Sequence, residues 1–135
     1  LYTLKLDNNI LSYLDSSLFE SFENLKDLDI SNNLLREIDL TIFFNRNQLR
    51  YLYLGKNPYI KFKKNSTKIR LESIFTLDIS STSKKLISSI DLNSSRKLIN
   101  LDLSFNELNM NDLNSIPFNN YPTLRNININ GIKID

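Results

Sequence analysis

The chain has 135 residues, a formal net charge of +2 and 24% charged residues, a balance that argues against electrostatically driven nucleic-acid binding. It contains no cysteine and no histidine, which excludes disulfides, thiolate metal sites, cysteine nucleophiles and histidine general bases. No run of about twenty apolar residues is present, so we predict no membrane insertion in this segment.

From the first residue onward, the sequence repeats one short pattern. Six units begin at Leu1, Leu25, Leu49, Ile74, Leu98 and Leu124, and their starts are 24, 24, 25, 24 and 26 residues apart. In chain order the units open with LYTLKLDNNIL, LKDLDISNNLL, LRYLYLGKNPY, IFTLDISSTSK, LINLDLSFNEL and LRNININGIKI. A nearly constant period predicts a tandem array, so we interpret residues 1–135 as a single repeat domain.

The shared pattern L-x-x-L-x-L-x-x-N-x-L resembles the leucine-rich repeat family. Further apolar residues follow at about positions 14, 19 and 22; they are Leu14, Phe19 and Phe22 in unit one, Ile38 and Phe43 in unit two, and Leu113, Phe118 and Tyr121 in unit five. This spacing resembles the 24-residue "typical" class of extracellular Toll-like and insect-type immune proteins. The resemblance implies an α/β solenoid, a horseshoe arc of about six repeats with a parallel sheet on its concave face and short helical or extended segments outside.

We predict a short strand at residues three to seven of each unit, followed by a turn whose backbone groups face the inside of the coil. An amide at position 9 can donate to and accept from those groups, which are costly to leave unpaired. Asn9, Asn33, Asn57 and Asn106 occupy this position, and we call them the asparagine ladder. Thr82 replaces the asparagine in unit four, where we expect the ladder to be weakest.

Both ends of the sequence are plain repeat, without a polar capping helix or a cysteine cluster. Each unit of a solenoid buries its faces only against its neighbours, so terminal units need cover. We therefore expect the chain to be a fragment of a longer array, with flanking repeats or caps beyond it.

The sequence predicts no enzyme, no cofactor and no metal site. The acids with a shared spacing, Asp27, Asp29, Asp78 and Asp102, fall at strand positions 3 and 5, which point to an open concave surface. Paired carboxylates for glycoside hydrolysis need a cleft that raises the pKa of one of them, and an open sheet provides none.

The same concave positions suggest a recognition surface. Its centre combines Arg50, Tyr51 and Tyr53, residue types that are enriched at binding hot spots. We predict a protein or peptide ligand there, bound by these three residues together with Asp27, Asp29, Asp78, Asp102 and Phe105. The alternatives are that the tyrosines merely cover the sheet, that the aspartates form a solvated surface, and that Phe105 folds over the rim of the array.

The convex side offers two further candidates. Five cations crowd the stretch from Lys61 to Glu72, which indicates either an anionic partner or, as we favour, a solvated loop. Asn65 and Asn93 each begin an N-x-[ST] glycosylation triplet, which fits an extracellular protein.

Taken with the resemblance, these features predict a non-catalytic recognition module of an extracellular or cell-surface protein. The alternative is an intracellular scaffold, or a regulatory segment that holds a partner enzyme.

Overall fold

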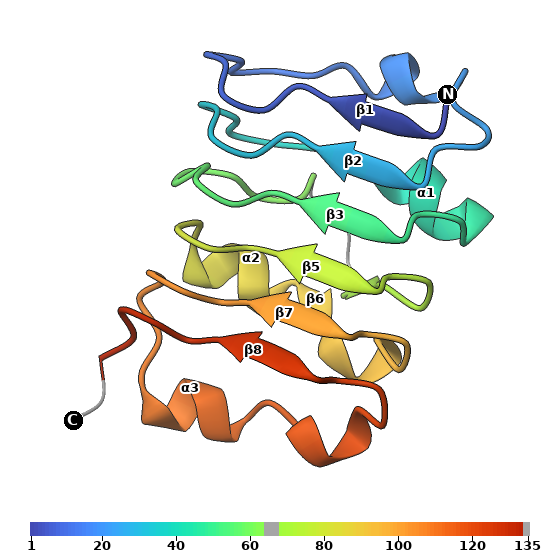
Figure 1. Cartoon of the computed structure of the whole chain (residues 1–135). Helices are drawn as coiled ribbons and strands as arrows, with labels where there is room; N and C mark the ends of the chain where they lie inside the picture. The colour runs from blue at the N-terminus through green and yellow to red at the C-terminus, as the bar shows by residue number, and fades with distance from the viewer. Residues whose placement is uncertain (64–67, 134–135) are drawn as a thin grey trace.

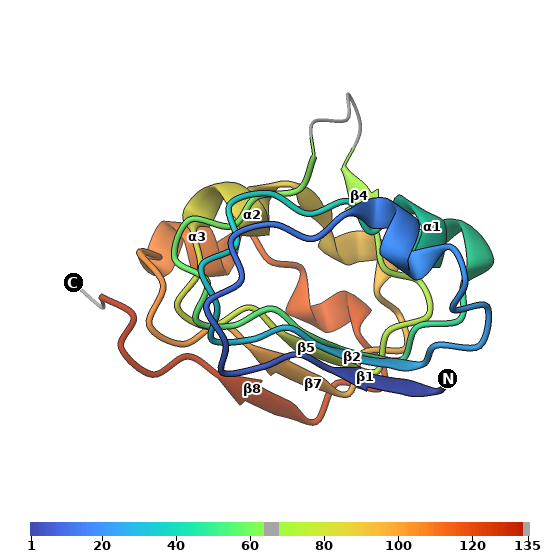
Figure 2. The same cartoon turned by 90° about the horizontal axis from the view of Figure 1, so that it is seen from above.

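The computed structural model describes residues 1–63 and 68–133. The chain winds as a coil in which every turn contributes one strand to a single parallel sheet, while helical and extended segments occupy the opposite side (Figures 1 and 2). The sheet has the order β1-β2-β3-β5-β7-β8, formed by β1 (Thr3–Lys5), β2 (Asp27–Asp29), β3 (Tyr51–Tyr53), β5 (Thr76–Asp78), β7 (Asn100–Asp102) and β8 (Asn126–Asn128). The predicted α/β solenoid of six repeats is confirmed.

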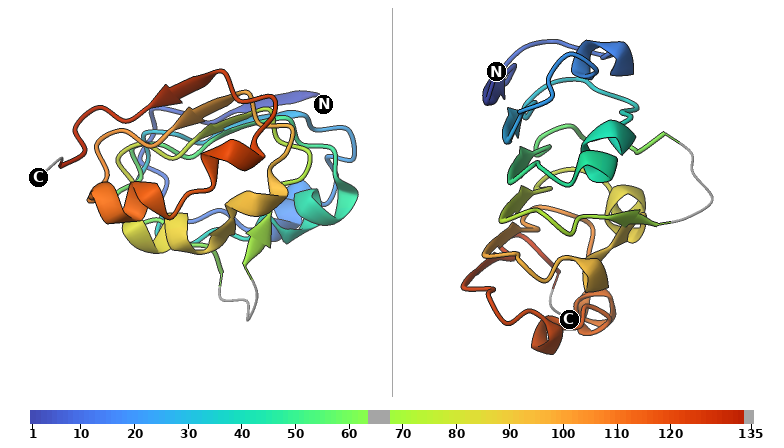
Figure 3. Two further views of the ribbon diagram at one scale, coloured as in Figure 1. Left: turned by 90° about the horizontal axis from the view of Figure 1, so that it is seen from below. Right: turned by 90° about the vertical axis from the view of Figure 1, so that its right-hand side faces the viewer.

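The register of the sheet follows the repeat. Position 3 pairs with position 3 along all six strands, from Thr3 with Asp27 to Asn100 with Asn126. The strands end at position 5, two residues earlier than we predicted. Backbone bonds nevertheless continue past this point, because the Leu6 N–H donates to the Asp29 carbonyl. Viewed along the sheet, the line of strands bows gently toward the outer segments at its middle (Figure 3, right).

The outer segments differ from unit to unit. They comprise the 3-10 helices η1 (Ser16–Phe19), η2 (Leu92–Ser94) and η3 (Phe118–Asn120), the helices α1 (Thr41–Arg46), α2 (Lys84–Ser88) and α3 (Met110–Asn114), and the paired strands β4 (Ile69–Arg70) and β6 (Ile90–Asp91). Local capping explains where two helices begin. The Ser83 side chain accepts from the Leu86 N–H at the start of α2, and Asn109 and Asp112 form a capping box at α3.

The core lies between the sheet and the outer segments. Leucine and isoleucine at positions 1, 4 and 6 are buried in the interior units, as Leu25, Leu28 and Ile30 show in unit two. On the outer side Phe19 and Phe43 are fully buried, with ring centroids 5.1 Å apart, so consecutive turns are joined by aromatic packing as well as by the sheet. None of the helices within residues 1–63 and 68–133 has the length and apolarity needed to cross a membrane.

Position 8 has a left-handed backbone in all six units. The φ angles are 56° at Asn8, 52° at Asn32, 55° at Lys56, 47° at Ser81, 55° at Phe105 and 71° at Gly131. Asparagine and glycine adopt this conformation readily, whereas a bulky aromatic side chain does so at a cost. Phe105 is therefore the outlier among the six.

Three asparagines at position 9 lie inside the coil and join neighbouring turns. The Asn33 Nδ2 donates to the Ile30 carbonyl of its own turn at 3.1 Å and to the Leu6 carbonyl of the preceding turn at 2.9 Å. Its Oδ1 accepts from the Leu11 N–H at 3.0 Å. Asn57 makes the same set of contacts to units two and three. Asn106 donates to the equivalent carbonyls of units four and five, but its Oδ1 accepts from the Thr82 N–H at position 9 of unit four, not from position 11.

Asn9 does not share this environment, so our expectation of a buried amide there is wrong. Its side chain is exposed and donates to the carbonyls of Leu6 and Asp7 within its own turn. The reason is geometric: the buried asparagines reach back to a preceding turn, and the part of the chain described here places none before unit one.

Thr82 bonds differently from the asparagines. Its hydroxyl donates to the Ile79 carbonyl of its own turn at 2.8 Å. Within residues 1–63 and 68–133 it makes no hydrogen bond to unit three, whereas Asn106 reaches back to the Ile79 carbonyl at 2.8 Å. The junction between units three and four thus lacks the bonds that a position-9 asparagine makes elsewhere, although the Ser83 hydroxyl of unit four donates to the Ile60 carbonyl of unit three at 3.3 Å.

Candidate functional site

The side chains at positions 3 and 5 alternate with the buried residues at position 4 and point away from the core. We call this surface the strand face. It consists of Thr3, Lys5, Asp27, Asp29, Tyr51, Tyr53, Thr76, Asp78, Asn100, Asp102, Asn126 and Asn128. The alternation follows from the pleat of a strand, and it gathers residues that are about 24 positions apart in the sequence into two parallel rows.

An aromatic cluster lies at the middle of the strand face. The rings of Tyr51 and Phe75 meet edge to face with centroids 6.3 Å apart, and the Arg50 guanidinium carbon lies 5.5 Å from the centroid of Phe75. Our sequence reasoning placed Arg50 and Tyr51 together but omitted Phe75 from the predicted site. The sequence could have indicated Phe75 as a member of the site, because Phe75 occupies the position in unit four that Arg50 occupies in unit three.

Arg50 is held in place by the backbone. Its Nη1 donates to the carbonyls of Asn47 at 3.1 Å, Leu49 at 3.3 Å and Ser73 at 3.4 Å. These bonds and the contact with Phe75 fix the guanidinium at the border of the sheet. The residue therefore supports the aromatic cluster, and its charge is already partly satisfied by carbonyl oxygens.

Tyr53 lies between carboxylates. Asp29 on β2 and Asp78 on β5 stand directly beside it in the register of the sheet. Partial burial raises the pKa of the Tyr53 hydroxyl, and the negative charges of Asp27, Asp29 and Asp78 raise it further. The surroundings of this ring are thus distinctly negative, although the chain as a whole is weakly positive.

The aspartates at position 5 also shape the turns. The Asp29 Oδ1 accepts from the Ser31 N–H at 3.0 Å and from its hydroxyl at 2.6 Å, and Asp102 accepts from the same groups of Ser104 at 2.9 and 2.6 Å. Asp78 accepts from the Ser80 N–H at 2.9 Å. Sequence reasoning missed this structural role, although the repeated D-x-S in units two, four and five indicates it.

Asp27 differs from the other three acids. Its Oδ1 is buried and has no hydrogen-bond partner among the residues that the structure describes. Burial raises the pKa of its carboxyl group, while the charge of Lys5 lowers it. Asp27 is therefore an incompletely satisfied carboxylate next to Tyr51 in the register of the sheet.

A shallow hollow of about 310 Å³ lies on the strand face between β3 and β8. Its lining combines polar side chains, among them Tyr53, Asp78, Asn100 and Asp102, with the apolar residues Leu77, Leu101 and Ile127. Amides cross-link this lining: the Asn126 Nδ2 donates to the Asn100 Oδ1 at 2.7 Å, and the Asn128 Nδ2 donates to the Asp102 Oδ2 at 3.1 Å. The hollow therefore adjoins the tyrosines and is furnished with hydrogen-bonding groups.

Phe105 lies apart from this centre, on the rim where the chain leaves the sheet. Its side chain is 66% exposed. The ring rests against the backbone of Gly131, since a Cβ added to that glycine would lie 2.5 Å from the ring. Phe105 thus combines the two alternatives considered above: it lies over the rim and is still exposed.

The basic stretch and the glycosylation triplets are the candidates on the convex side. Lys61 pairs with Glu37 at 3.6 Å and Arg70 with Glu72 at 2.7 Å, so two cations of the basic stretch have acidic partners. Asn93 is exposed in η2, whereas Asn65 lies outside the described residues.

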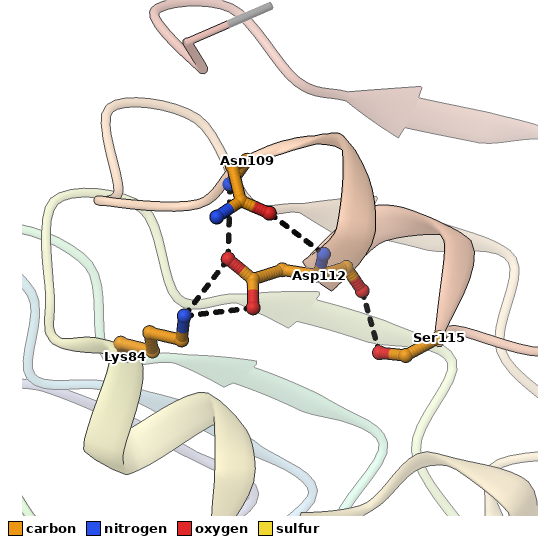
Figure 4. Close-up of polar contacts among 4 residues, drawn as sticks. All are labelled: Lys84, Asn109, Asp112 and Ser115. Atoms are coloured by element: carbon orange, nitrogen blue, oxygen red, sulfur yellow. Dashed lines mark hydrogen bonds and ion pairs between the residues drawn. The ribbon is translucent and has the colours of Figure 1, made fainter.

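A further ion pair joins the outer helices of units four and five. Lys84 donates to both carboxylate oxygens of Asp112, at 2.7 and 3.0 Å, and the same carboxylate accepts from the Asn109 N–H (Figure 4). These contacts explain why Lys84, which stands where other units carry an apolar residue, is accommodated on the surface.

The site contains few groups for chemistry. In the part of the chain that the structure describes, no three acidic side chains converge as a metal site would require. The arrangement can therefore offer aromatic contact, hydrogen bonds and negative charge on an open surface.

The coil, its six-stranded parallel sheet and its repeated turns define a leucine-rich repeat solenoid. Residues 1–59 match the leucine rich repeat family model. The whole chain is similar to the crystal structure of an internalin from Listeria monocytogenes, with a TM-score of 0.69 and 22% sequence identity, and it spans 43% of the length of that chain. No curated protein matches the sequence.

Proposed function

We propose that this chain is a non-catalytic recognition module that binds a protein or peptide ligand on its strand face. The observation that carries the proposal is the aromatic cluster at the centre of the sheet, where Tyr51 is 39% exposed and braced by Phe75. A ring that is held in place loses little conformational freedom when a ligand covers it, so its contact area contributes efficiently to affinity.

The leucine-rich repeat fold supports the same proposal, because a stack of turns presents an extended surface to a partner. We propose that the ligand contacts the predicted set of Tyr51, Tyr53, Asp27, Asp29, Asp78 and Asp102, with Arg50 at its border. Within the set, Arg50 serves as a support and the two tyrosines provide contact area. Phe105 would contact only a ligand that extends to the rim.

A test begins with a display library of random peptides, selected on the immobilised 135-residue chain. The affinity of each enriched peptide is then measured by calorimetry for the wild type and for Tyr51→Ala/Tyr53→Ala. We expect the double variant to weaken binding by more than about 1 kcal/mol, as truncation of hot-spot residues does, and to leave the melting temperature nearly unchanged.

The control for this experiment removes two tyrosines outside the strand positions. Tyr13 and Tyr59 are 68% and 69% exposed, so Tyr13→Ala/Tyr59→Ala deletes the same chemical groups elsewhere on the surface. Equal affinity of the wild type and the strand-face variant, or a larger loss in the control, would contradict the proposed binding surface.

We also propose an extracellular or cell-surface location, for a protein related to the 24-residue "typical" class. The support is the exposed Asn93, which begins a glycosylation triplet on the side opposite the sheet, so a glycan there would leave the strand face open. Secretion from cultured mammalian cells behind a signal peptide would give a glycan-dependent mass shift that Asn93→Gln reduces. A secreted chain without such a shift would favour the intracellular scaffold.

A further inference from the structure

The charge of the strand face is opposite in sign to that of the molecule. The charged side chains of the strand face are four aspartates and one lysine, Lys5. The whole chain, in contrast, has a formal charge of +2. Of the cations that border the sheet, Arg50 donates to three carbonyls and the Lys26 Nζ lies 5.7 Å from the centroid of the Tyr2 ring, whereas Arg125 is exposed beside β8, at the end of the sheet. The negative charge that the surface presents to a partner is therefore concentrated around Tyr53, where Asp27, Asp29 and Asp78 lie.

The charged groups are arranged around an aromatic ring. Asp29 and Asp78 flank Tyr53 in the register of β2, β3 and β5, and the hollow of about 310 Å³ begins on the Asp78 side of this ring. Cationic groups are attracted to the face of a tyrosine ring and to carboxylates beside it. An ammonium or guanidinium group placed over Tyr53 would meet both attractions at once.

The carboxylates retain hydrogen-bonding capacity for such a partner. In Asp29 one oxygen accepts from Ser31, and in Asp78 one oxygen accepts from the Ser80 N–H. Among residues 1–63 and 68–133 no donor bonds to the other oxygen of either carboxylate. Burial and the negative charges of Asp29 and Asp102 raise the pKa of Asp78, so a nearby cation would relieve an unfavourable charge.

From this charge complementarity we infer that the strand face is a docking surface for an extended segment of a partner protein that carries lysine or arginine side chains. The inference rests on the proposed function and names the chemistry of its ligand. The segment lies across the strands, with one cationic side chain over Tyr53 and a second above the hollow near Asp102. Electrostatic complementarity of this kind sets specificity and association rate.

The test uses fluorescently labelled peptides of equal length: one rich in lysine and arginine, one in glutamate and aspartate, and one neutral. Binding to the 135-residue chain is followed by fluorescence anisotropy at about 50 mM and about 300 mM salt, because screening weakens exposed charge pairs. We expect the basic peptide to bind at least about ten-fold more tightly than the other two at low salt, and to lose most of this advantage at high salt.

Charge-removing variants locate the contact. Asp29→Asn and Asp78→Asn preserve the turn, because Asn128 already makes the equivalent bond to the Asn130 N–H in unit six. Each should weaken the basic peptide by about three- to five-fold, in line with exposed ion pairs. Glu23→Gln and Glu107→Gln remove exposed carboxylates outside the strand positions and should leave its affinity unchanged.

The outcomes separate the two proposals. If the neutral or acidic peptide binds best and Tyr51→Ala/Tyr53→Ala abolishes that binding, the strand face is the binding surface and the cationic partner is wrong. If the basic peptide binds with the same affinity to every strand-face variant, the proposed binding surface fails as well. Absence of binding by the basic peptide, or equal binding by all three peptides, also overturns the inference.

Discussion

At the scale of single residues, asparagine side chains join the turns of this solenoid. The strand must end after position 5 so that the chain can leave the sheet, and the carbonyls of the following turn then face the interior. A carboxamide has both donors and an acceptor, so one side chain can bond to two successive turns. This is why a polar residue is fully buried at Asn57, among leucines.

The first prediction concerns Asn33→Leu. The substitution removes the side-chain partner of the Leu11 N–H, and within the described residues it leaves the Leu6 and Ile30 carbonyls with only the bonds that they accept from Asn9 and Asn57. Because a buried group left unsatisfied costs about 1–3 kcal/mol, we expect the free energy of unfolding to fall by about 1–3 kcal/mol. Urea denaturation followed by circular dichroism measures the change.

The matched control for this prediction is Asn9→Leu. Asn9 is exposed and bonds only within its own turn, so water can replace its bonds at a cost below about 1 kcal/mol. A loss of stability as large as that of Asn33→Leu would show that burial does not decide the role of these amides.

The second prediction concerns the strained backbone at Phe105. Asparagine occupies the same left-handed position in units one and two, so Phe105→Asn should relieve strain of about 1 kcal/mol while losing the ring contact with Gly131. We expect the melting temperature to stay the same or to rise. A fall of more than about 5 °C, which corresponds to about 1 kcal/mol for a domain of this size, would show that the aromatic ring is a structural requirement.

At the scale of elements, the sheet and the outer segments were predictable to different degrees. The strands share one position in every unit because the leucines at positions 4 and 6 and the turn at position 8 recur with the period, so alignment of the sequence gives the register directly. The outer segments share only scattered apolar positions, which do not fix whether a segment is helical or extended. Their secondary structure depends on local sequence features, such as the Ser83 cap of α2 and the two extra residues that make room for α3.

The sequence predicted which residues lie at the candidate site better than it predicted how their side chains are arranged. Periodicity alone places Tyr51 and Tyr53 on one surface, because alternate residues of a strand point the same way. It does not reveal that Arg50 is occupied by backbone carbonyls or that Phe75 braces Tyr51, because both depend on side-chain conformations across neighbouring turns. The D-x-S bonds of the aspartates, in contrast, are local and could have been predicted.

The third prediction concerns the junction between units three and four, where Thr82 makes no side-chain bond to unit three within the described residues. Thr82→Asn should supply the missing bond to the Leu54 carbonyl, by analogy with Asn57 and Asn106, and should stabilise the chain by about 1 kcal/mol. Hydrogen exchange measures the local effect: the amides of β3 and β5 should exchange more slowly in the variant. Unchanged exchange there, or lower stability, would contradict the weak-junction interpretation.

The fourth prediction concerns the contact between α2 and α3 shown in Figure 4. The bond from Lys84 lowers the pKa of the Asp112 carboxyl below its ordinary value of 3.8, and the Asn109 N–H lowers it further. A carboxyl group whose pKa is lower in the folded than in the unfolded state stabilises the folded state at pH values above its ordinary pKa. This stabilisation is lost as the pH falls through the lowered pKa.

The measurement compares the melting temperatures of the wild type and Asp112→Asn between about pH 7 and pH 2.5, a range that spans an ordinary aspartate pKa. We expect the wild type to melt higher at neutral pH and the difference to shrink as the pH falls. A difference that is constant across this range would show that the charge of Asp112 does not contribute to stability.

At the scale of the whole molecule, the two end faces expose positions that the interior units bury. Leu1 is 60% exposed although its counterparts Leu25 and Leu49 are fully buried, and Ile127 on β8 is 42% exposed although Leu101 beside it is 2% exposed. The outer edges of β1 and β8 also carry backbone groups that are open to pairing. We propose that flanking repeats, caps or a partner cover both ends.

The fifth prediction follows from these end faces. Without cover, the 135-residue chain should self-associate as its concentration rises, because exposed apolar surface and unpaired strand edges favour end-to-end contact. Sedimentation velocity over a range of concentrations measures this association. Ile127→Thr/Ile129→Thr makes the end face at β8 more polar and should weaken the association, whereas the same change at Ile10, which is 85% exposed away from the strands, should have little effect. A chain that stays monomeric at every concentration and melts cooperatively would show that its ends need no cover.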